Sequence, residues 1–339
     1  MKKYWKQILL ASTVLIGFGF SAQFTTPLYF EVPKDWPKPA YDFSKNPLTE
    51  EGFQLGRNLF HDPILSRDKT ISCASCHSPG NAFTHIDHDV SHGIDGKTGT
   101  RNSLALINLA WSKNFMWDGG VNNLEVQPIN PITNPNEMDE KLENVIAKLE
   151  QSPKYRALFT KAFGDDKITS QRILKALAQF TVMLKSSDSK YDKVMRHEAT
   201  FTKDEEKGYQ LFKANCASCH KEPLFTSNTF ENNGLQPDST FKDGGRFRIT
   251  KNAKDSLRFK VPTLRNIELT APYMHDGRIK NLSMVLFHYT DDVYQSPTLS
   301  KQLRKKMVLN EQDKNNLLAF LGTLTDESFI KNPRFLYPK

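Results

Sequence analysis

Two copies of one short motif constrain this chain more than any other feature of its sequence. Cys73-Ala74-Ser75-Cys76-His77 recurs as Cys216-Ala217-Ser218-Cys219-His220, and together the copies use all 4 cysteines. Two thiols separated by two residues, with a histidine directly after them, let a haem form two thioether bonds while that histidine ligates the iron. One copy alone would also suit a zinc half-site, a redox dithiol or a structural disulfide. Two complete copies with no cysteine left over favour two covalently attached haem c groups.

The surroundings of the two motifs repeat as well. Thr49 can cap a helix before the first motif, and Thr202 with Glu205 forms a capping-box pattern before the second. Gly52-Phe53-Gln54-Leu55 is echoed by Gly208-Tyr209-Gln210-Leu211. Each half also closes with an apolar helical face. These faces comprise Ile173, Leu174, Leu177, Phe180 and Leu184 in the first half, and Leu317, Leu318, Phe320, Leu321 and Leu324 in the second.

This repeat predicts a mainly α fold with two cytochrome c-like domains, each around one covalently bound haem and each with long irregular loops. A chain of 339 residues is long enough for two such domains. We expect a Pro-rich, extended N-terminal arm over residues 23–48, a first haem domain over 49–187 and a second over 188–339. The polar stretch from Ser186 to Ser189 is the expected boundary.

Residues 1–22 have the pattern of an export signal. Lys2 and Lys3 precede an apolar run from Ile8 to Ala22, which is short for a membrane span. Phe20-Ser21-Ala22 departs from the usual small-residue cleavage site, so an uncleaved membrane anchor is the alternative. Both interpretations place the domains outside the cytoplasm, and we expect a periplasmic protein.

The net charge of +8 does not indicate a nucleic-acid-binding protein. Part of this charge belongs to the leader, and ~4 negative charges from haem propionates would bring the mature protein close to neutral. A basic patch that docks an acidic electron carrier stays open as a hypothesis.

Further motifs carry a resemblance to a known family. Taken in this order with two haem motifs, the sequence resembles the bacterial di-haem cytochrome c peroxidases and their MauG-type relatives across nearly the whole mature chain. The motifs are Thr100-Arg101-Asn102-Ser103, Phe115-Met116-Trp117-Asp118-Gly119, Gln127-Pro128-Ile129, Asn134-Pro135-Asn136-Glu137-Met138, Val261-Pro262-Thr263-Leu264-Arg265-Asn266 and Leu269-Thr270-Ala271-Pro272-Tyr273-Met274-His275-Asp276-Gly277.

The resemblance implies unequal roles for the two haems. His77 would be the proximal ligand of an N-terminal haem where peroxide reacts, and His220 that of a C-terminal haem that transfers electrons. Gln127 and Glu137 match the family's distal pair, and a carboxylate there can take a proton from peroxide and return it to the leaving oxygen. Trp117 matches a tryptophan placed between the haems, although core packing is the usual fate of this residue.

The resemblance also implies a calcium ion between the domains, held by Asn102, Thr270 and Pro272. Side-chain and backbone carbonyl oxygens suit this hard cation. Arg246 and Arg265 are candidate partners of the haem propionates, because guanidinium groups bind carboxylates in a bidentate manner. A surface ion pair is the alternative for each arginine.

One position departs from the usual peroxidase pattern. Where the second haem usually has a methionine ligand, this sequence has Tyr289, as the MauG-type relatives do. Tyrosine favours ferric iron and lowers the reduction potential, whereas methionine raises it. We predict Tyr289 as the second axial ligand. The alternatives are His288, Met274 and Met284.

A second departure lies in the loop from Val90 to Thr100. Peroxidases that rest in an inactive state block the reactive iron with a loop histidine, and Ile94 occupies that place here. His92 is a candidate replacement, although a loop that also has His85 and His88 nearby is most often simply solvated. Without a blocking ligand the enzyme should need no reductive activation.

Three functions follow from these residues. The first is peroxidase activity, which reduces hydrogen peroxide with electrons from a small donor such as a cytochrome c. The second is a MauG-like oxidase that removes electrons from aromatic residues of a partner protein, and the third is a di-haem electron carrier without chemistry at iron. Family members are often homodimers, although no stretch of the sequence indicates an interface.

Overall fold

A computed structural model describes residues 25–86 and 88–338, so the predicted export signal or anchor lies outside the described residues. Within them, no helix has the length and apolar character needed to cross a membrane. The elements are α1 (Glu50–His61), α2 (Cys73–Cys76), α3 (Ile129–Thr133), α4 (Leu142–Glu150), α5 (Pro153–Phe163), α6 (Ser170–Val182), α7 (Lys190–Met195), α8 (Lys203–Asn215), β1 (Phe230–Glu231), α9 (Phe247–Thr250), β2 (Phe259–Lys260), α10 (Leu282–Asp291), α11 (Glu311–Gly322) and α12 (Glu327–Ile330).

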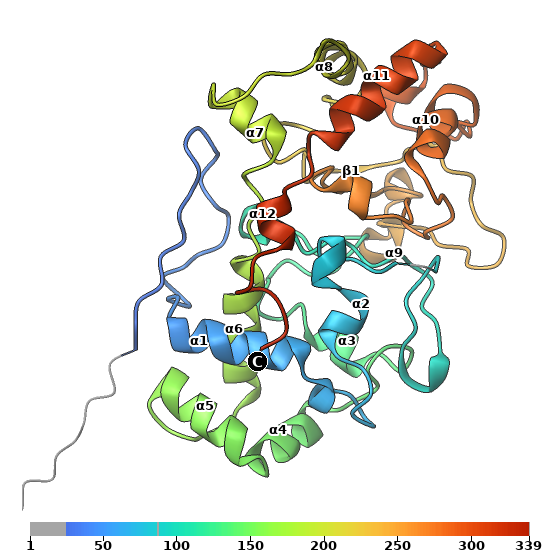
Figure 1. The fold of residues 1–339 in the computed structure, drawn as a ribbon. Coiled ribbons are helices and arrows are strands. Elements are labelled where there is room, and N and C mark those ends of the chain that lie inside the picture. Colours follow the sequence, from blue (N-terminus) through green and yellow to red (C-terminus); the bar gives the residue numbers. More distant parts are fainter. Residues whose placement is uncertain (1–24, 87, 339) are drawn as a thin grey trace, which may run out of the picture.

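The predicted mainly α fold with two halves is confirmed (Figure 1). α1 to α6 form the lower half in this view, and α7 to α11 form the upper half. The strands β1 and β2 pair antiparallel, with Phe230 opposite Lys260 and Glu231 opposite Phe259. Long segments without regular structure fill the space between the halves, as the loop-rich middle regions of the sequence predict.

Each half is built on one pair of crossing helices, α1 with α6 and α8 with α11. The predicted caps are confirmed, because the Thr49 hydroxyl accepts from Gly52 N and Thr202 forms a capping box with Glu205. A Cβ added at Gly56 would lie 1.9 Å from the backbone oxygen of Ala176 in α6. A Cβ added at Gly208 would lie 1.9 Å from the backbone oxygen of Asn316 in α11. Glycine thus permits both crossings.

This geometry shifts the predicted repeat by one helical turn. Gly208 corresponds in space to Gly56 rather than to Gly52, because Gly56 and Gly208 make the same close contact with the partner helix. Gly52 instead faces the side chain of Gln179. The structural repeat is confirmed, but the sequence echo that indicated it is offset by four residues.

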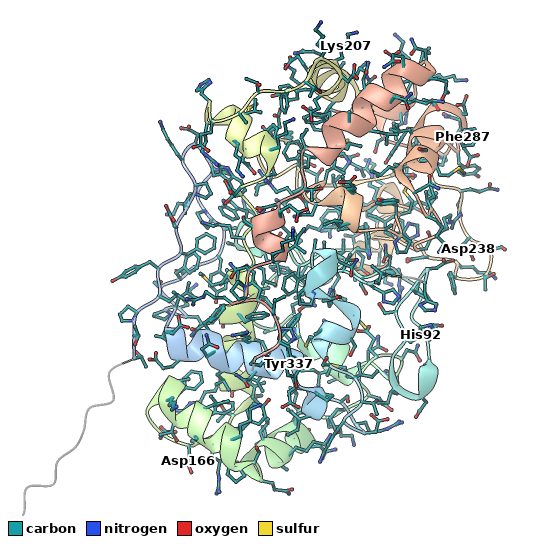
Figure 2. All side chains as sticks on the ribbon, viewed as in Figure 1. His92, Asp166, Lys207, Asp238, Phe287 and Tyr337 are labelled. Carbon is teal, nitrogen blue, oxygen red and sulfur yellow. The ribbon has the colours of Figure 1, made fainter. Side chains whose placement is uncertain are left out.

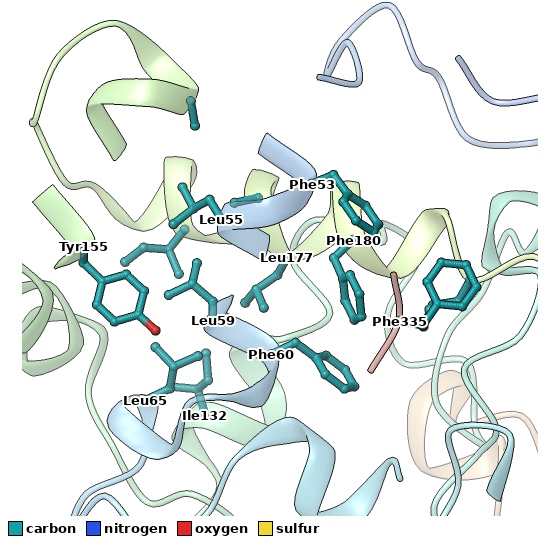
Figure 3. Packing of buried hydrophobic residues seen from close by; sticks show 14 of the residues in the cluster. Phe53, Leu55, Leu59, Phe60, Leu65, Ile132, Tyr155, Leu177, Phe180 and Phe335 are labelled. Atoms are coloured by element: carbon teal, nitrogen blue, oxygen red, sulfur yellow. The ribbon is translucent and has the colours of Figure 1, made fainter. Parts of the chain in front are cut away.

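Phenylalanine rings fill the two cores in the same way. In the lower half the Phe60 and Phe180 rings lie 5.0 Å apart between centroids (Figure 3), and in the upper half Phe212 and Phe320 lie 5.1 Å apart. These rings come from the crossing helices. The apolar faces predicted for the closing helices therefore do face the cores.

A buried polar network holds the stretch from Ser186 to Ser189, which the sequence predicts as the boundary. Asn108 donates its backbone N–H to Leu184 O at 2.9 Å, and its Oδ1 accepts from Ser186 N at 3.0 Å. Asn266 repeats this pattern with Leu324 O at 3.0 Å and Asp326 N at 2.7 Å. Asn266 Nδ2 also donates to Ser186 Oγ at 3.0 Å, so the boundary stretch is fixed to both halves by matched asparagines.

Both ends of the described chain cross between the halves. In the N-terminal arm, the Trp36 ring centroid lies 4.6 Å from the guanidinium carbon of Arg265, so the arm is packed and not free. In α12, the ring of Phe329 lies 5.7 Å from that of Phe83, and after α12 the chain returns to the lower half (Figure 1), where the ring of Phe335 lies 6.4 Å from that of Phe83. The last residues of the predicted second domain, 188–339, therefore pack in the core of the first half.

Candidate functional site

The first motif forms a short helix that presents its histidine to a large cavity. α2 ends at Cys76, and His77 follows directly. The Nδ1 atom of His77 lies 3.0 Å from the carbonyl oxygen of Phe83, which holds the ring as the Nδ1–H tautomer. Burial lowers the pKa of His77 to about 4 and keeps the imidazole neutral. Its Nε2 lone pair is therefore left for a metal.

The cavity beside His77 has a volume of about 1030 Å³ and is lined from both halves of the chain. A space of this size suits a large cofactor. Its wall includes Cys76 as well as the predicted functional residues Gln127, Glu137 and Trp117. The structure thus brings the haem-attachment motif and the predicted distal pair together around one cavity.

Glu137 and Gln127 reach the cavity from the two ends of α3. Asn134 Nδ2 donates to Glu137 Oε1 at 2.6 Å, and Ile94 N donates to the backbone oxygen of Glu137 at 2.7 Å. Burial raises the pKa of the Glu137 carboxyl, and the Asn134 hydrogen bond opposes that rise. A raised pKa makes this carboxyl group a better proton acceptor than an ordinary glutamate, as general acid–base catalysis requires.

The loop over residues 90–100 packs against the backbone of Glu137. Ile94 is fully buried and does not line the cavity, whereas His92 does. The ring of His92, labelled in Figure 2, lies 4.8 Å from the ring of His88 between centroids. The place expected for a blocking histidine is thus filled by a buried apolar side chain, and His92 remains the loop histidine that faces the cavity.

The second motif follows α8 and repeats the first arrangement. His220 Nδ1 lies 3.2 Å from the carbonyl oxygens of both Phe225 and Pro262, and burial lowers its pKa to about 4. A second, smaller cavity is lined by His220, Cys216 and Tyr289. Both cavities therefore adjoin a Cys-Ala-Ser-Cys-His motif and have in their wall a neutral histidine whose Nε2 is available, and this donor set fits haem c.

The structure narrows the choice of second ligand at this cavity. Tyr289 lines it, and burial raises the pKa of its phenol to about 12. Met274 lines it as well, with Asn233 Nδ2 3.2 Å from its Sδ. His288 does not, since its Nε2 lies 3.1 Å from the carbonyl oxygen of Asn233, and Met284 is 49% exposed. Tyr289 and Met274 remain as candidates.

Trp117 lies in the wall that the two cavities share. Its Nε1–H donates to the carbonyl oxygen of Asn102 at 2.7 Å, and its own carbonyl oxygen accepts from Lys260 N at 2.7 Å. These bonds fix the indole between the haem-binding regions. Packing and electron relay are compatible at this position.

The predicted calcium ligands Asn102, Thr270 and Pro272 all line the first cavity. Asn102 Nδ2 lies 2.5 Å from the carbonyl oxygen of Pro272, while its Oδ1 is buried and has no hydrogen-bond partner in the described chain. A buried amide oxygen without a donor fits a hard cation. Because residues 25–86 and 88–338 contain no metal-binding cluster of three His, Cys, Asp or Glu side chains, amide, hydroxyl and carbonyl oxygens would have to hold the ion.

Neither arginine predicted to bind a propionate lines either of the two cavities. Arg265 is fully buried and forms a bidentate ion pair with Asp192, at 2.7 and 2.8 Å, and donates through Nε to Pro223 O at 2.9 Å. Arg246 Nη1 donates to Asp118 O at 2.9 Å. Both guanidinium groups join segments of protein in this structure, and their role as propionate partners stays a prediction.

One cation that sequence reasoning missed does line both cavities. Lys260 lies directly before the Val261-Pro262 motif, but its sequence context does not distinguish it from a surface lysine. Its enclosure depends on segments far away in the chain.

Comparisons with known sequences agree with this geometry. The family profile described as di-haem cytochrome c peroxidase matches residues 50–200, and the one described as cytochrome c matches residues 205–325. The methylamine utilization protein MauG of Methylophilus methylotrophus is 34% identical over 325 residues, which cover 94% of this chain and 94% of that protein. The cytochrome c551 peroxidase of Nitrosomonas europaea is 35% identical over 289 residues, which cover 83% of this chain and 82% of that protein.

A solved structure is similar over nearly its whole length. The crystal structure of a MauG-like protein associated with microbial copper homeostasis superimposes with a TM-score of 0.84 at 33% identity. The match covers 92% of this chain and 99% of that chain.

Proposed function

This chain belongs to the di-haem cytochrome c peroxidase and MauG family, and we propose that it reduces hydrogen peroxide to water in the cavity of His77. Electrons would enter through the haem domain of His220 from a small donor protein such as a cytochrome c. The observation that carries the proposal is Glu137, a buried carboxyl group in the same cavity as the first haem motif. A di-haem electron carrier without chemistry at iron would have no use for this group.

Glu137 is the proton-transfer group of the proposed reaction. The haem, when bound, supplies the iron and the electrons that reduce peroxide. The carboxylate of Glu137 accepts a proton from one peroxide oxygen and returns it to the departing one, so that water leaves in place of hydroxide. The Nε2–H of Gln127 is a donor that can orient peroxide beside this carboxylate.

Substitution of Glu137 by Gln tests the proposal directly. The change keeps the size of the side chain and removes its proton transfer, so kcat/KM for peroxide should fall by about 10²–10⁴-fold, the usual contribution of general acid–base catalysis. Turnover is measured with a small cytochrome c or an artificial donor. Glu143→Gln, in an exposed position of α4, is the control and should retain full activity.

Two results would count against the proposal. Glu137→Gln with native turnover would remove Glu137 from the chemistry. Negligible peroxide reduction by the native protein would remove the peroxidase function and leave the oxidase as the better candidate.

The second candidate is a MauG-like oxidase, and Tyr289 is the observation that favours it. A tyrosine ligand stabilises ferric iron, so the second haem would be a poor store of reducing electrons and a better holder of an oxidising equivalent. Trp117, between the cavities, would connect the two haems in that reaction. The aromatic side chain that such an oxidase would act on belongs to a partner protein.

The remaining parts of the proposal follow from the family and the sequence. Export by residues 1–22 would place the protein in the periplasm. A calcium ion at Asn102, Thr270 and Pro272 is supported by the partnerless Asn102 Oδ1. A homodimer, as in many family members, is a further expectation.

A further inference from the structure

Lys260 lies at the boundary of the two haem-binding regions. It ends β2, and its backbone N–H donates to Trp117 O at 2.7 Å. Lys260 is part of the lining of both the cavity of His77 and the cavity of His220.

Within residues 25–86 and 88–338, the ammonium group has no negative partner. Its Nζ donates to Ser112 Oγ at 3.3 Å, and no carboxylate there forms an ion pair with it or raises its pKa. Burial lowers the pKa of Lys260 to about 8. In contrast, Arg101 in the wall of the first cavity is already paired with Asp118 at 2.7 Å and Asp243 at 2.6 Å.

A buried ammonium ion without a counter-ion is costly, because it loses hydration without regaining an opposite charge. An anion that occupies the adjacent cavity removes this cost. The haem propionates are the carboxylates that these two cavities receive when the cofactors are attached. A haem propionate can therefore be the negative partner of the Lys260 ammonium group.

We propose that Lys260 is the counter-ion of a haem propionate at the boundary between the two haems, and that its charge raises the reduction potential of at least one of them. This proposal rests on the presence of the haems and does not depend on which reaction they perform. Reduction of a ferric haem adds one negative charge, so a nearby cation stabilises the reduced form. Lys260 is thus assigned as a positioning residue for electron flow.

Spectroelectrochemical titration of the holoprotein tests this assignment. Lys260→Met and Lys260→Gln should each lower the midpoint potential of at least one haem, whereas Lys260→Arg should keep it near the native value. Lys185→Met is the matched control. Burial also lowers the pKa of Lys185, but its Nζ donates to Glu31 O at 2.8 Å and it lines neither cavity.

Unchanged midpoint potentials of both haems in Lys260→Met and Lys260→Gln would overturn the proposal. A fall in Lys260→Arg as large as that in Lys260→Met would also overturn it, since packing rather than charge would then be responsible. Peroxide turnover is not used in this test. If Glu137→Gln loses activity while the Lys260 variants keep native potentials, only the proposal for Lys260 fails. If the Lys260 variants have lower potentials while Glu137→Gln keeps native turnover, only the proposed function fails.

Discussion

At the scale of single residues, the two haem motifs are identical in sequence and their surroundings make them unequal. His77 and His220 are held alike, each by its Nδ1 against backbone carbonyl oxygens. The two cavities differ in their other lining residues, since Glu137 lines the cavity of His77 and Tyr289 lines the cavity of His220. In the proposed function, the two haems are thus distinguished by residues from the loop after α3 and from α10, far from the motifs in the chain.

The pH dependence of peroxide reduction should report the state of Glu137. Its pKa is raised by burial, so the carboxylate needed as a base is lost at a higher pH than for an ordinary glutamate. The acid limb of kcat/KM should therefore lie above the usual range of glutamate. Asn134→Ala removes a hydrogen bond that favours the carboxylate and should move the limb to still higher pH.

Asn144→Ala is the control for this experiment, because Asn144 Nδ2 makes the same type of bond to Glu140 Oε1 at 2.9 Å, outside the cavity. It should leave the limb in place. An acid limb that is identical in Asn134→Ala and the native enzyme would show that another group titrates.

Two residues whose surroundings the sequence did not predict share one physical cause. Arg265 pairs with Asp192, which is 73 positions away, and Lys260 is enclosed between segments of both halves. Charge is visible in a sequence, but its partner is a tertiary property. Gln127 and Glu137 were found because they belong to a family motif.

At the scale of elements, the helices were predictable and their contact register was not. Apolar periodicity and caps at Thr49 and Thr202 predicted the helices that cross. The repeat was misaligned by one turn, because Gly52 and Gly56 lie on the same helical face and sequence alone does not show which one meets the partner backbone.

Gly208→Ala should destabilise the upper half. The new Cβ would lie 1.9 Å from the backbone oxygen of Asn316, which cannot move away as a flexible side chain would. Overpacking of this type costs about 1–3 kcal/mol of unfolding free energy. Urea denaturation should show a lower midpoint for this variant.

Gly80→Ala is the matched control, since a Cβ there meets nothing within 4 Å. Its unfolding midpoint should equal or slightly exceed the native value. Equal midpoints for Gly208→Ala and Gly80→Ala would contradict the close helix crossing.

At the scale of the whole molecule, two cytochrome c-like halves were predictable from the repeated motif. The contacts that join the two halves were not predictable, because the N-terminal arm and the residues from α12 onward are not part of the repeat. Phe329 completes the lower core with Phe83, although it lies at the far end of the chain. The N-terminal arm thus packs against the upper half, and the C-terminal residues pack in the lower half. These contacts fix the two halves, and with them the two cavities, relative to each other.

Titration of the fully oxidised protein with cyanide tests the inequality of the two irons most directly. We predict one cyanide bound per chain, at the open iron of His77, and two in Tyr289→Phe, which opens the iron of His220. A near-infrared sulfur band would identify Met274 as the ligand instead. Binding of no cyanide or of two by the native protein would contradict the assignment of one open and one closed haem.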